Sequence, residues 1–350
     1  NLGSPAMKPL STCRRRMHGL SLVELMVALT IGLIILTAVS SLFVSSKQTY
    51  TTQDSLSRLQ ENARFAMQFL IKDIRLGGYF GCLDEMYAPS PGIAVAGGLT
   101  FVTNATVPFE GAENASGTWL PSGSVLPAGM KTGTDAIAIR MSNLGAWANV
   151  TPGMLNGSSN INVDSVTPFA VSDIVVVSDC ASADITQVSG FSGGALVHSM
   201  ALQKAYEAPA ARVYKMVTRQ YFIGTKTVDG KIVPVLYRQD NAGAAQELVE
   251  GVESLQILYG EDTDTPPTDL TDGVPNIYRK ASAVVNWSKV ISVRIGILVS
   301  TLDEKNTDID TTPSYDVDGD GSSDFTPPST PPDRHRRRIF RATVQLRNML

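Results

Sequence analysis

The feature that most constrains this chain is an apolar run, residues 20–44, in which Glu24 is the only charged residue. As an α-helix the run would be ~37 Å long, and the hydrocarbon core of a bilayer is about 30 Å thick. Arg14, Arg15 and Arg16 stand just before it, so the positive-inside rule keeps the N-terminus in the cytoplasm. A charged side chain at the centre of a membrane helix costs about 2.5–3.5 kcal/mol, so Glu24 is predicted to be functional.

Three interpretations of this run differ in where the chain is cut. An ordinary membrane anchor is not cut. A secretory signal would be cut after small residues such as Ala38, Val39 and Ser40, but the apolar run is longer than such signals usually are. The third possibility is a cut on the cytoplasmic side, after Gly19, which leaves the apolar helix on the mature protein. The basic leader that ends in glycine favours this third interpretation.

The helical pattern continues beyond the apolar run. From residue 56, apolar residues recur at alternating steps of three and four, which places them on one helix face. They are Leu59, Ala63, Met67, Leu70 and Ile74, and between them lie Arg58, Glu61, Arg64, Lys72, Asp73 and Arg75. Gly77 and Gly78 are expected to end the helix. We therefore predict one helix over residues 20–76, with residues 20–44 in a membrane or filament core.

Downstream, the period changes from that of a helix to that of a strand. Residues 213–223, 291–299 and 340–346 alternate in the manner of antiparallel sheets with one face in water. Residues 89–133 are rich in Gly, Pro, Ser and Thr and are expected to form loops with short strands. The predicted fold class is α+β, with the long helix packed on a globular head of antiparallel β-sheets, residues 77–350.

Charge and cysteine content limit the function classes. The formal net charge is −4, and removal of a leader over residues 1–19, with its four basic residues, makes it −8. Such an acidic protein is a poor general binder of nucleic acid.

Cys13 leaves with the leader, whereas Cys82 and Cys180 remain on the side predicted to be oxidising. This pair predicts a disulfide, and a metal site is the less favoured alternative because a second pair of ligands is missing.

A second motif lies near the C-terminus. Asp316, Asp318 and Asp320 alternate and are followed by Asp324, which is the spacing of a calcium loop. Pro327 stands where an EF-hand has its bidentate Glu, so a full EF-hand is excluded. The alternative is a solvated acidic linker. Further ligands for Ca2+ could come from Asp308 and Asp310, or from Glu261, Asp262 and Asp264.

A basic run follows the acidic one, at residues 334–338, with Arg341 close behind. It could bind DNA, but no aromatic residues interleave with the arginines as a stacking platform requires. The favoured interpretation is a solvated strand start that offsets the nearby acidic charge. The histidines His18, His198 and His335 stand in no catalytic or zinc pattern, so the protein is not expected to be an enzyme.

The residues around the predicted cut carry a resemblance to a known family. The run from Gly19 to Leu25 resembles the class III signal of type IV pilins and of type II secretion pseudopilins. In that family a prepilin peptidase cuts after the glycine and methylates the new N-terminal amine. The resemblance implies a cut between Gly19 and Leu20 and methylation of Leu20, although the family usually has Phe there. It also implies that Glu24 neutralises the amine of a neighbouring subunit during assembly.

Residues 60–66 with 74–82, 248–262 and 340–348 resemble the PilW minor pilins of type IV pili, whereas residues 87–210 carry no pattern that we recognise. The J-type minor pseudopilin of type II secretion is the nearest alternative. The resemblance implies an inner-membrane protein that joins other minor pilins, the major pilin and the inner-membrane assembly platform. It would help to start filament assembly and sit at the pilus tip, where a large tip adhesin is a further partner. A head that itself binds a ligand, for adhesion or DNA uptake, is the alternative function.

Overall fold

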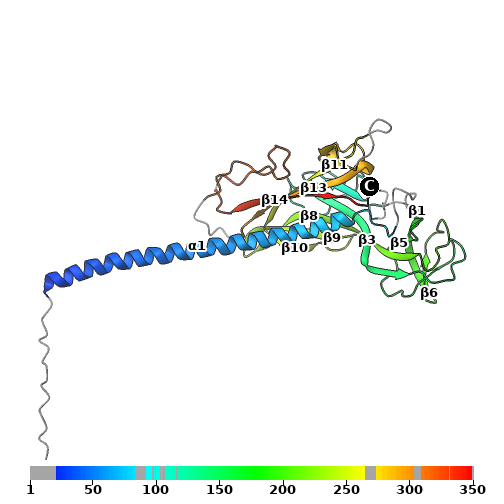
Figure 1. Cartoon of the computed structure of the whole chain (residues 1–350), viewed down its shortest axis with the longest axis horizontal. Helices are drawn as coiled ribbons and strands as arrows, with labels where there is room; N and C mark the ends of the chain where they lie inside the picture. Colours follow the sequence, from blue (N-terminus) through cyan, green and yellow to red (C-terminus); the bar gives the residue numbers. More distant parts are fainter. Residues whose placement is uncertain are drawn as a thin grey trace, which may run out of the picture. The chain divides into compact units, whose positions relative to one another are not determined.

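The computed structural model describes residues 21–82, 92–96, 98, 100–102, 104, 107–115, 117–264, 273–302, 309–330 and 332–348. Their fold is one long helix, α1 (Leu22–Leu76), and a β-rich head (Figure 1). The chain divides into two compact units between Gln53 and Asp54, so the C-terminal part of α1 belongs to the head. The predicted α+β class is confirmed.

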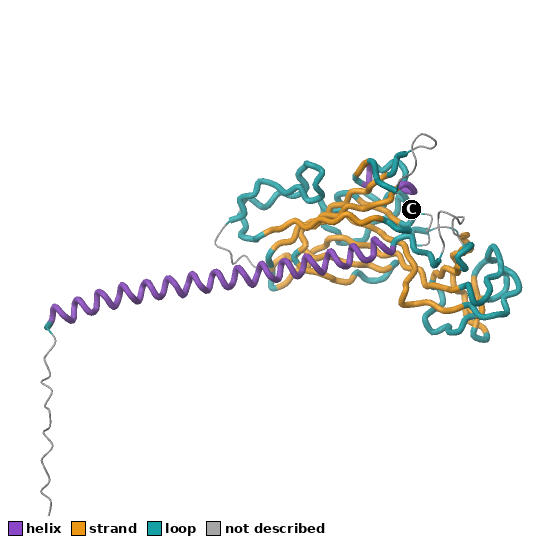
Figure 2. The backbone as a smooth tube through the Cα atoms, in the orientation of Figure 1, coloured by secondary structure: helices purple, strands orange, loops and turns teal. Residues whose placement is uncertain are grey.

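The described strands form two sheets, which Figure 2 shows beside the C-terminal part of α1. The first sheet contains β1 (Gly92–Ala94), β2 (Phe109–Ala112), β3 (Ala136–Asn149), β4 (Ile161–Asn162), β5 (Ile174–Ser178), β6 (Ala183–Ser192), β7 (Ala195–His198), β8 (Arg212–Val228), β9 (Lys231–Asp240) and β10 (Gln246–Glu250). The second has the order β12 (Ile277–Arg279), β11 (Val252–Glu261), β13 (Val290–Ser300) and β14 (Arg337–Gln345). Each predicted strand is present, as β8, β13 and β14. The pairing of β1 with β6 is parallel, and the other strand pairs are antiparallel.

The main core lies between α1 and both sheets. The predicted apolar face of the helix is buried there: Leu59, Ala63, Met67, Leu70 and Ile74. These side chains pack with residues such as Tyr221 of β8, Leu255 of β11 and Ile295 of β13. Burial of each large apolar side chain contributes about 1.5–3 kcal/mol. The helix is thus fastened to the head along the face that the sequence pattern predicts.

A second core fills the part of the head for which the sequence offered no pattern. It is built mainly from residues 148–213, with buried side chains such as Ile161, Val175 and Leu196. The long strands β3 and β8 run through both cores, and their pairing shifts register between Ser142 and Trp147. Such an irregularity bends a strand pair, and Figure 1 shows β3 turning toward the β5–β6 end of the head. The head therefore has two lobes that share two strands.

The expectation of one wet face on each sheet is wrong for the central strands β11 and β13. Every residue of β11 is buried, as is every residue of β13 except the half-buried Arg294. One face of these strands packs on the main core. Loops cover the other face: Gln256 donates to the carbonyl oxygen of Gly133 at 3.0 Å, and the acidic segment lies against Gly296. Alternation in the sequence could not reveal this cover, because it comes from distant parts of the chain.

The predicted disulfide is present. Cys82, which follows the end of α1, is bonded to Cys180 in the turn after β5, with their Cα atoms 4.6 Å apart. The bond joins residues 98 positions apart and ties the end of the helix to the second lobe. The alternative of a metal pair is thereby excluded, because both thiols are consumed.

Replacing both Cys82 and Cys180 by alanine is expected to lower the free energy of unfolding by about 4–5 kcal/mol, since a loop of this length constrains the unfolded chain. All three tryptophans, Trp119, Trp147 and Trp287, lie in the head, so their fluorescence during urea denaturation reports its unfolding. The reduced wild-type chain is the control and should match the double variant. An unchanged urea midpoint would contradict the predicted contribution.

Candidate functional site

The start of α1 is set by local hydrogen bonds. Ser21 precedes the helix, and its Oγ accepts the backbone N–H of Glu24 at 3.2 Å. Serine followed three residues later by glutamate is the capping-box pattern, which satisfies N–H groups that have no partner in the first helical turn. The predicted cleavage and methylation positions, Gly19 and Leu20, lie outside the described residues.

The described part of the first unit of the chain presents an exposed apolar helix surface. All described residues from 21 to 50 are exposed. α1 is the described helix that is long and apolar enough to cross a membrane, and it lies near the N-terminus. The hydroxyls of Thr30, Thr37 and Ser41 donate to carbonyl oxygens three or four residues earlier, so they need no partner outside the helix. Among the described residues, no cation pairs with Glu24.

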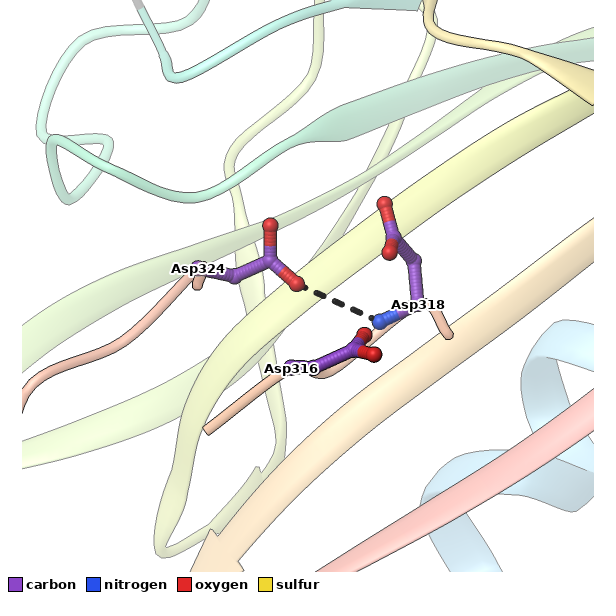
Figure 3. A group of neighbouring side chains, drawn as sticks. All are labelled: Asp316, Asp318 and Asp324. Carbon is purple, nitrogen blue, oxygen red and sulfur yellow. Dashed lines mark hydrogen bonds between the residues drawn. The ribbon is translucent and has the colours of Figure 1, made fainter. Parts of the chain in front are cut away.

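A second candidate site lies at the turn of residues 316–324. Asp316, Asp318 and Asp324 each offer one carboxylate oxygen, and these atoms lie within 4.8 Å of one another (Figure 3). Asp324 Oδ2 accepts the backbone N–H groups of Val317 and Asp318 at 2.7 and 3.3 Å. Asp316 accepts two glycine N–H groups further along the turn, at 2.6 and 3.1 Å. The turn therefore gathers three of the four predicted ligands.

The fourth predicted ligand, Asp320, does not join this group. It accepts a backbone N–H within the turn, and its Oδ2 lies 3.4 Å from Nζ of Lys280. Two of the suggested additional ligands, Asp310 and Glu261, pair with arginines instead. Asp308 lies outside the described residues. The spacing in the sequence thus identified the turn but not the set of carboxylates that meet.

The acidic turn is packed on the second sheet. Beneath it lies Gly296 of β13, where an added Cβ would meet the carbonyl oxygen of Val317 at 2.0 Å. From β14, Arg341 donates to that same oxygen at 3.0 Å and to the carbonyl oxygen of Asp316. Val317 and Asp318 are both 0% exposed. The interpretation as a solvated linker is therefore wrong for these two residues, whereas residues 319–323 are exposed.

Asp318 is the most deeply buried carboxylate of the turn. Its Oδ1 accepts the N–H of Asp320 at 3.0 Å, whereas its Oδ2 is buried and has no hydrogen-bond partner in the described part of the chain. Burial, aided by the nearby charges of Asp324 and Asp320, raises the pKa of Asp318 to about 6, although the hydrogen bond from the Asp320 N–H opposes the rise. Although burial alone would lower the pKa of Lys280, the facing carboxylates of Asp320 and Asp324 raise it.

The basic run is only partly a solvated strand start. The Arg337 side chain is 1% exposed and contacts the carboxylates of Glu253, Asp310 and Asp333 at 2.6, 2.9 and 2.5 Å. Burial alone would lower the pKa of Arg337, but these three carboxylates raise it. The solvated interpretation is wrong for this residue. Because Arg337 is buried and paired with three carboxylates, its positive charge contributes little to a surface that could attract DNA.

Sequence reasoning missed a buried ion pair between the helix and the head. Asp73 was placed among the charged residues between the apolar positions of α1, but it is 3% exposed. Arg219 of β8 donates to its two oxygens at 3.0 and 3.1 Å, and the Tyr221 hydroxyl donates to Oδ2. Burial raises the pKa of Tyr221 well above its usual value, and the Asp73 charge adds to the rise. A signal was available, because Asp73 is next to Ile74 and three residues after Leu70, both on the buried face.

Comparison with known proteins finds matches at both ends of the chain. Residues 14–40 match the prokaryotic N-terminal methylation motif. Residues 220–348 match the family described as Type IV Pilus-assembly protein W, PilW. These two matches support a type IV pilus minor pilin of the PilW family. A comparison with curated proteins found no match.

The two matches divide the minor pilin into parts. The methylation motif spans Gly19, Leu20 and Glu24, and the PilW match spans the acidic turn together with most of β8 and the strands from β9 to β14. Residues 41–219, which include most of the second core, lie outside both matches. The methylation motif and the apolar helix indicate an inner-membrane anchor and contacts with other pilins and the assembly machinery. Pilin membership indicates a structural protein.

The histidines of the head fit a structural role. The ring nitrogens of His198 lie 2.6 and 2.8 Å from the carbonyl oxygens of Met200 and Ser159. His335 Nδ1 lies 2.5 Å from the carbonyl oxygen of Thr301. These contacts tie loops together, as expected for a pilin head.

Proposed function

We propose that this minor pilin helps to initiate type IV pilus assembly, in a complex with other minor pilins, and stays at or near the pilus tip. The observation that supports the tip position is the second lobe of the head. This lobe has its own core, whose residues lie outside both family matches. In a helical filament the head of an internal subunit is surrounded by neighbouring heads. A head enlarged by a second lobe is accommodated most easily at the end of the filament, where no subunit lies above it.

Assembly itself would depend on α1. Before assembly, membrane lipid would cover its exposed apolar surface. After assembly, other pilin helices, including those of the major pilin, would cover it. Cleavage by the prepilin peptidase creates a positive amine at Leu20. In the filament core, that amine would pair with Glu24 of a neighbouring subunit. Because charges attract strongly in a medium of low dielectric and an unpaired one is penalised, this pair would fix the register between subunits.

The orientation of the protein follows from the leader and the disulfide. Arg14, Arg15 and Arg16 would hold the leader in the cytoplasm, where the peptidase cut after Gly19 is expected. The head would lie in the periplasm, an oxidising compartment in which the Cys82–Cys180 bond forms and persists. The inner-membrane assembly platform would then draw the complex into a pilus, and a large tip adhesin would be carried with it.

Gold-labelled antibodies against the head test this proposal on isolated pili. We expect label at one end of a pilus and absent from its length, and far fewer pili on cells that lack only this protein. Cells complemented with the wild-type chain are the control. Label distributed along the whole filament would contradict the tip position, and normal pilus numbers without the protein would contradict a role in initiation.

A further inference from the structure

The geometry of the acidic turn points to a calcium site formed by Asp316, Asp318 and Asp324. This site is distinct from the helix that serves assembly, and the inference does not depend on where the minor pilin lies in the filament. The three side chains come from the two ends of one turn and approach a common space (Figure 3). Carboxylate oxygens are the ligands that calcium prefers in proteins.

The observation that carries the inference is the buried Oδ2 of Asp318. The residue is 0% exposed, and no described residue donates a hydrogen bond to this oxygen, although its companion Oδ1 has a donor. Buried polar atoms are almost always satisfied, and a buried carboxylate oxygen is among the costliest to leave without a partner. A bound cation between the three aspartates would supply the missing interaction.

The spacing of the oxygens favours calcium over magnesium. Ligand oxygens lie about 2.3–2.6 Å from calcium and about 2.0–2.1 Å from magnesium, which also requires near-octahedral geometry. Oxygens within 4.8 Å of one another can therefore surround calcium with little contraction of the turn. Each carboxylate oxygen of Asp316 accepts one backbone N–H and keeps a lone pair for the ion, whereas Oδ2 of Asp324 accepts two, so Oδ1 of Asp324 would be the ligand. Water would complete the coordination.

The sheet and one lysine set the conditions for binding. The contacts of Gly296 and Arg341 with the turn hold its backbone in place before an ion arrives, so little ordering remains to be done on binding. Lys280 lies at the rim, with Nζ 3.4 Å from Asp320 and 3.8 Å from Asp324. Its ammonium partly balances the acidic charge when no metal is bound. Arg341 Nη2 lies 3.6 Å from Oδ1 of Asp316, so calcium would bind in competition with the positive charges of both Lys280 and Arg341.

Calorimetric titration of the chelator-treated full chain in detergent micelles, with CaCl2 as the probe, tests the site. We expect one calcium per chain with a Kd of about 0.1–1 mM, as in extracellular calcium modules, and much weaker binding of MgCl2. Asp318→Asn keeps the side-chain volume but removes the charge, and it should weaken binding by roughly tenfold or more because affinity follows ligand charge. Asp320→Asn is the matched control, because it removes an equal charge from a residue outside the group, and it should change the Kd by less than about threefold.

The variant Lys280→Met is expected to bind calcium more tightly, a result that misfolding of the variant could not produce. If calcium binds here, removing the competing ammonium should lower the Kd by several-fold and enlarge the rise in melting temperature that CaCl2 produces. If the carboxylates serve only as partners of Lys280, the variant should melt lower and still bind no calcium. The inference is overturned by an absence of calcium binding at about 10 mM, an order of magnitude above the expected range. Equal binding of magnesium, or equal loss of binding in Asp320→Asn and Asp318→Asn, would also overturn it.

Discussion

Replacing Glu24 by alanine is expected to leave membrane insertion intact and to remove this minor pilin from pili. Insertion becomes easier, by up to about 2.5–3.5 kcal/mol, because Glu24 is the only charge in the apolar run. Incorporation fails because the amine of a neighbouring Leu20 loses its partner, and an uncompensated buried charge is destabilising by about 3–5 kcal/mol. Immunoblots of membranes and of sheared pili measure the two effects, in cells whose only copy is the variant.

Glutamine at position 24 separates charge pairing from helix capping. Gln serves as well as Glu at the third position of a capping box, so Glu24→Gln preserves the local structure that begins at Ser21. It removes only the negative charge. If pairing with an amine is the role of Glu24, the glutamine variant is excluded from pili as completely as the alanine variant. Wild-type amounts of the glutamine variant in pili would refute pairing and leave capping as the role.

A bulky residue at position 19 is expected to stop maturation altogether. We expect the cut directly after Gly19, which lies within the matched methylation motif, and a side chain such as that of valine would obstruct the peptidase there. Mass spectrometry of the wild-type protein should find an N-terminus at methylated Leu20. Gly19→Val should accumulate in the inner membrane as the longer form, with its leader attached and its amine unavailable to Glu24.

The competing signal-peptide interpretation has its own control. Ser40→Leu places a bulky residue at the small-residue site and leaves Gly19 unchanged. Maturation should proceed normally in this variant. A wild-type N-terminus at Ser41, together with a block by Ser40→Leu, would establish ordinary signal cleavage instead. The continuity of α1 through residues 38–40 agrees with the cut after Gly19, because the helix shows no break there.

Much of the fold could be predicted because the relevant signals are local. The apolar run and the steps of three and four define the helix and its buried face down to Leu59, Leu70 and Ile74. Alternation identifies β8, β13 and β14, and two cysteines outside the leader allow only one internal disulfide. The cleavage signal is equally local, since a peptidase reads it as a short stretch of chain. Apart from the disulfide, which follows from the number of cysteines, each of these features depends on residues a few positions apart.

Tertiary structure decided which polar groups are buried. Asp73 meets Arg219 across 146 positions, and Arg337 meets Glu253 across 84, so no short pattern in the sequence could indicate these pairs. The same holds for the acidic turn, where the sequence gives four spaced aspartates. The turn packs on Gly296 and Arg341, and Asp318 is buried there. Asp320 pairs with Lys280 and lies outside the group of three carboxylates. The neighbours of a charged residue in the sequence do not determine its burial or its ion pairs. Both depend on which distant segments of the chain fold against it.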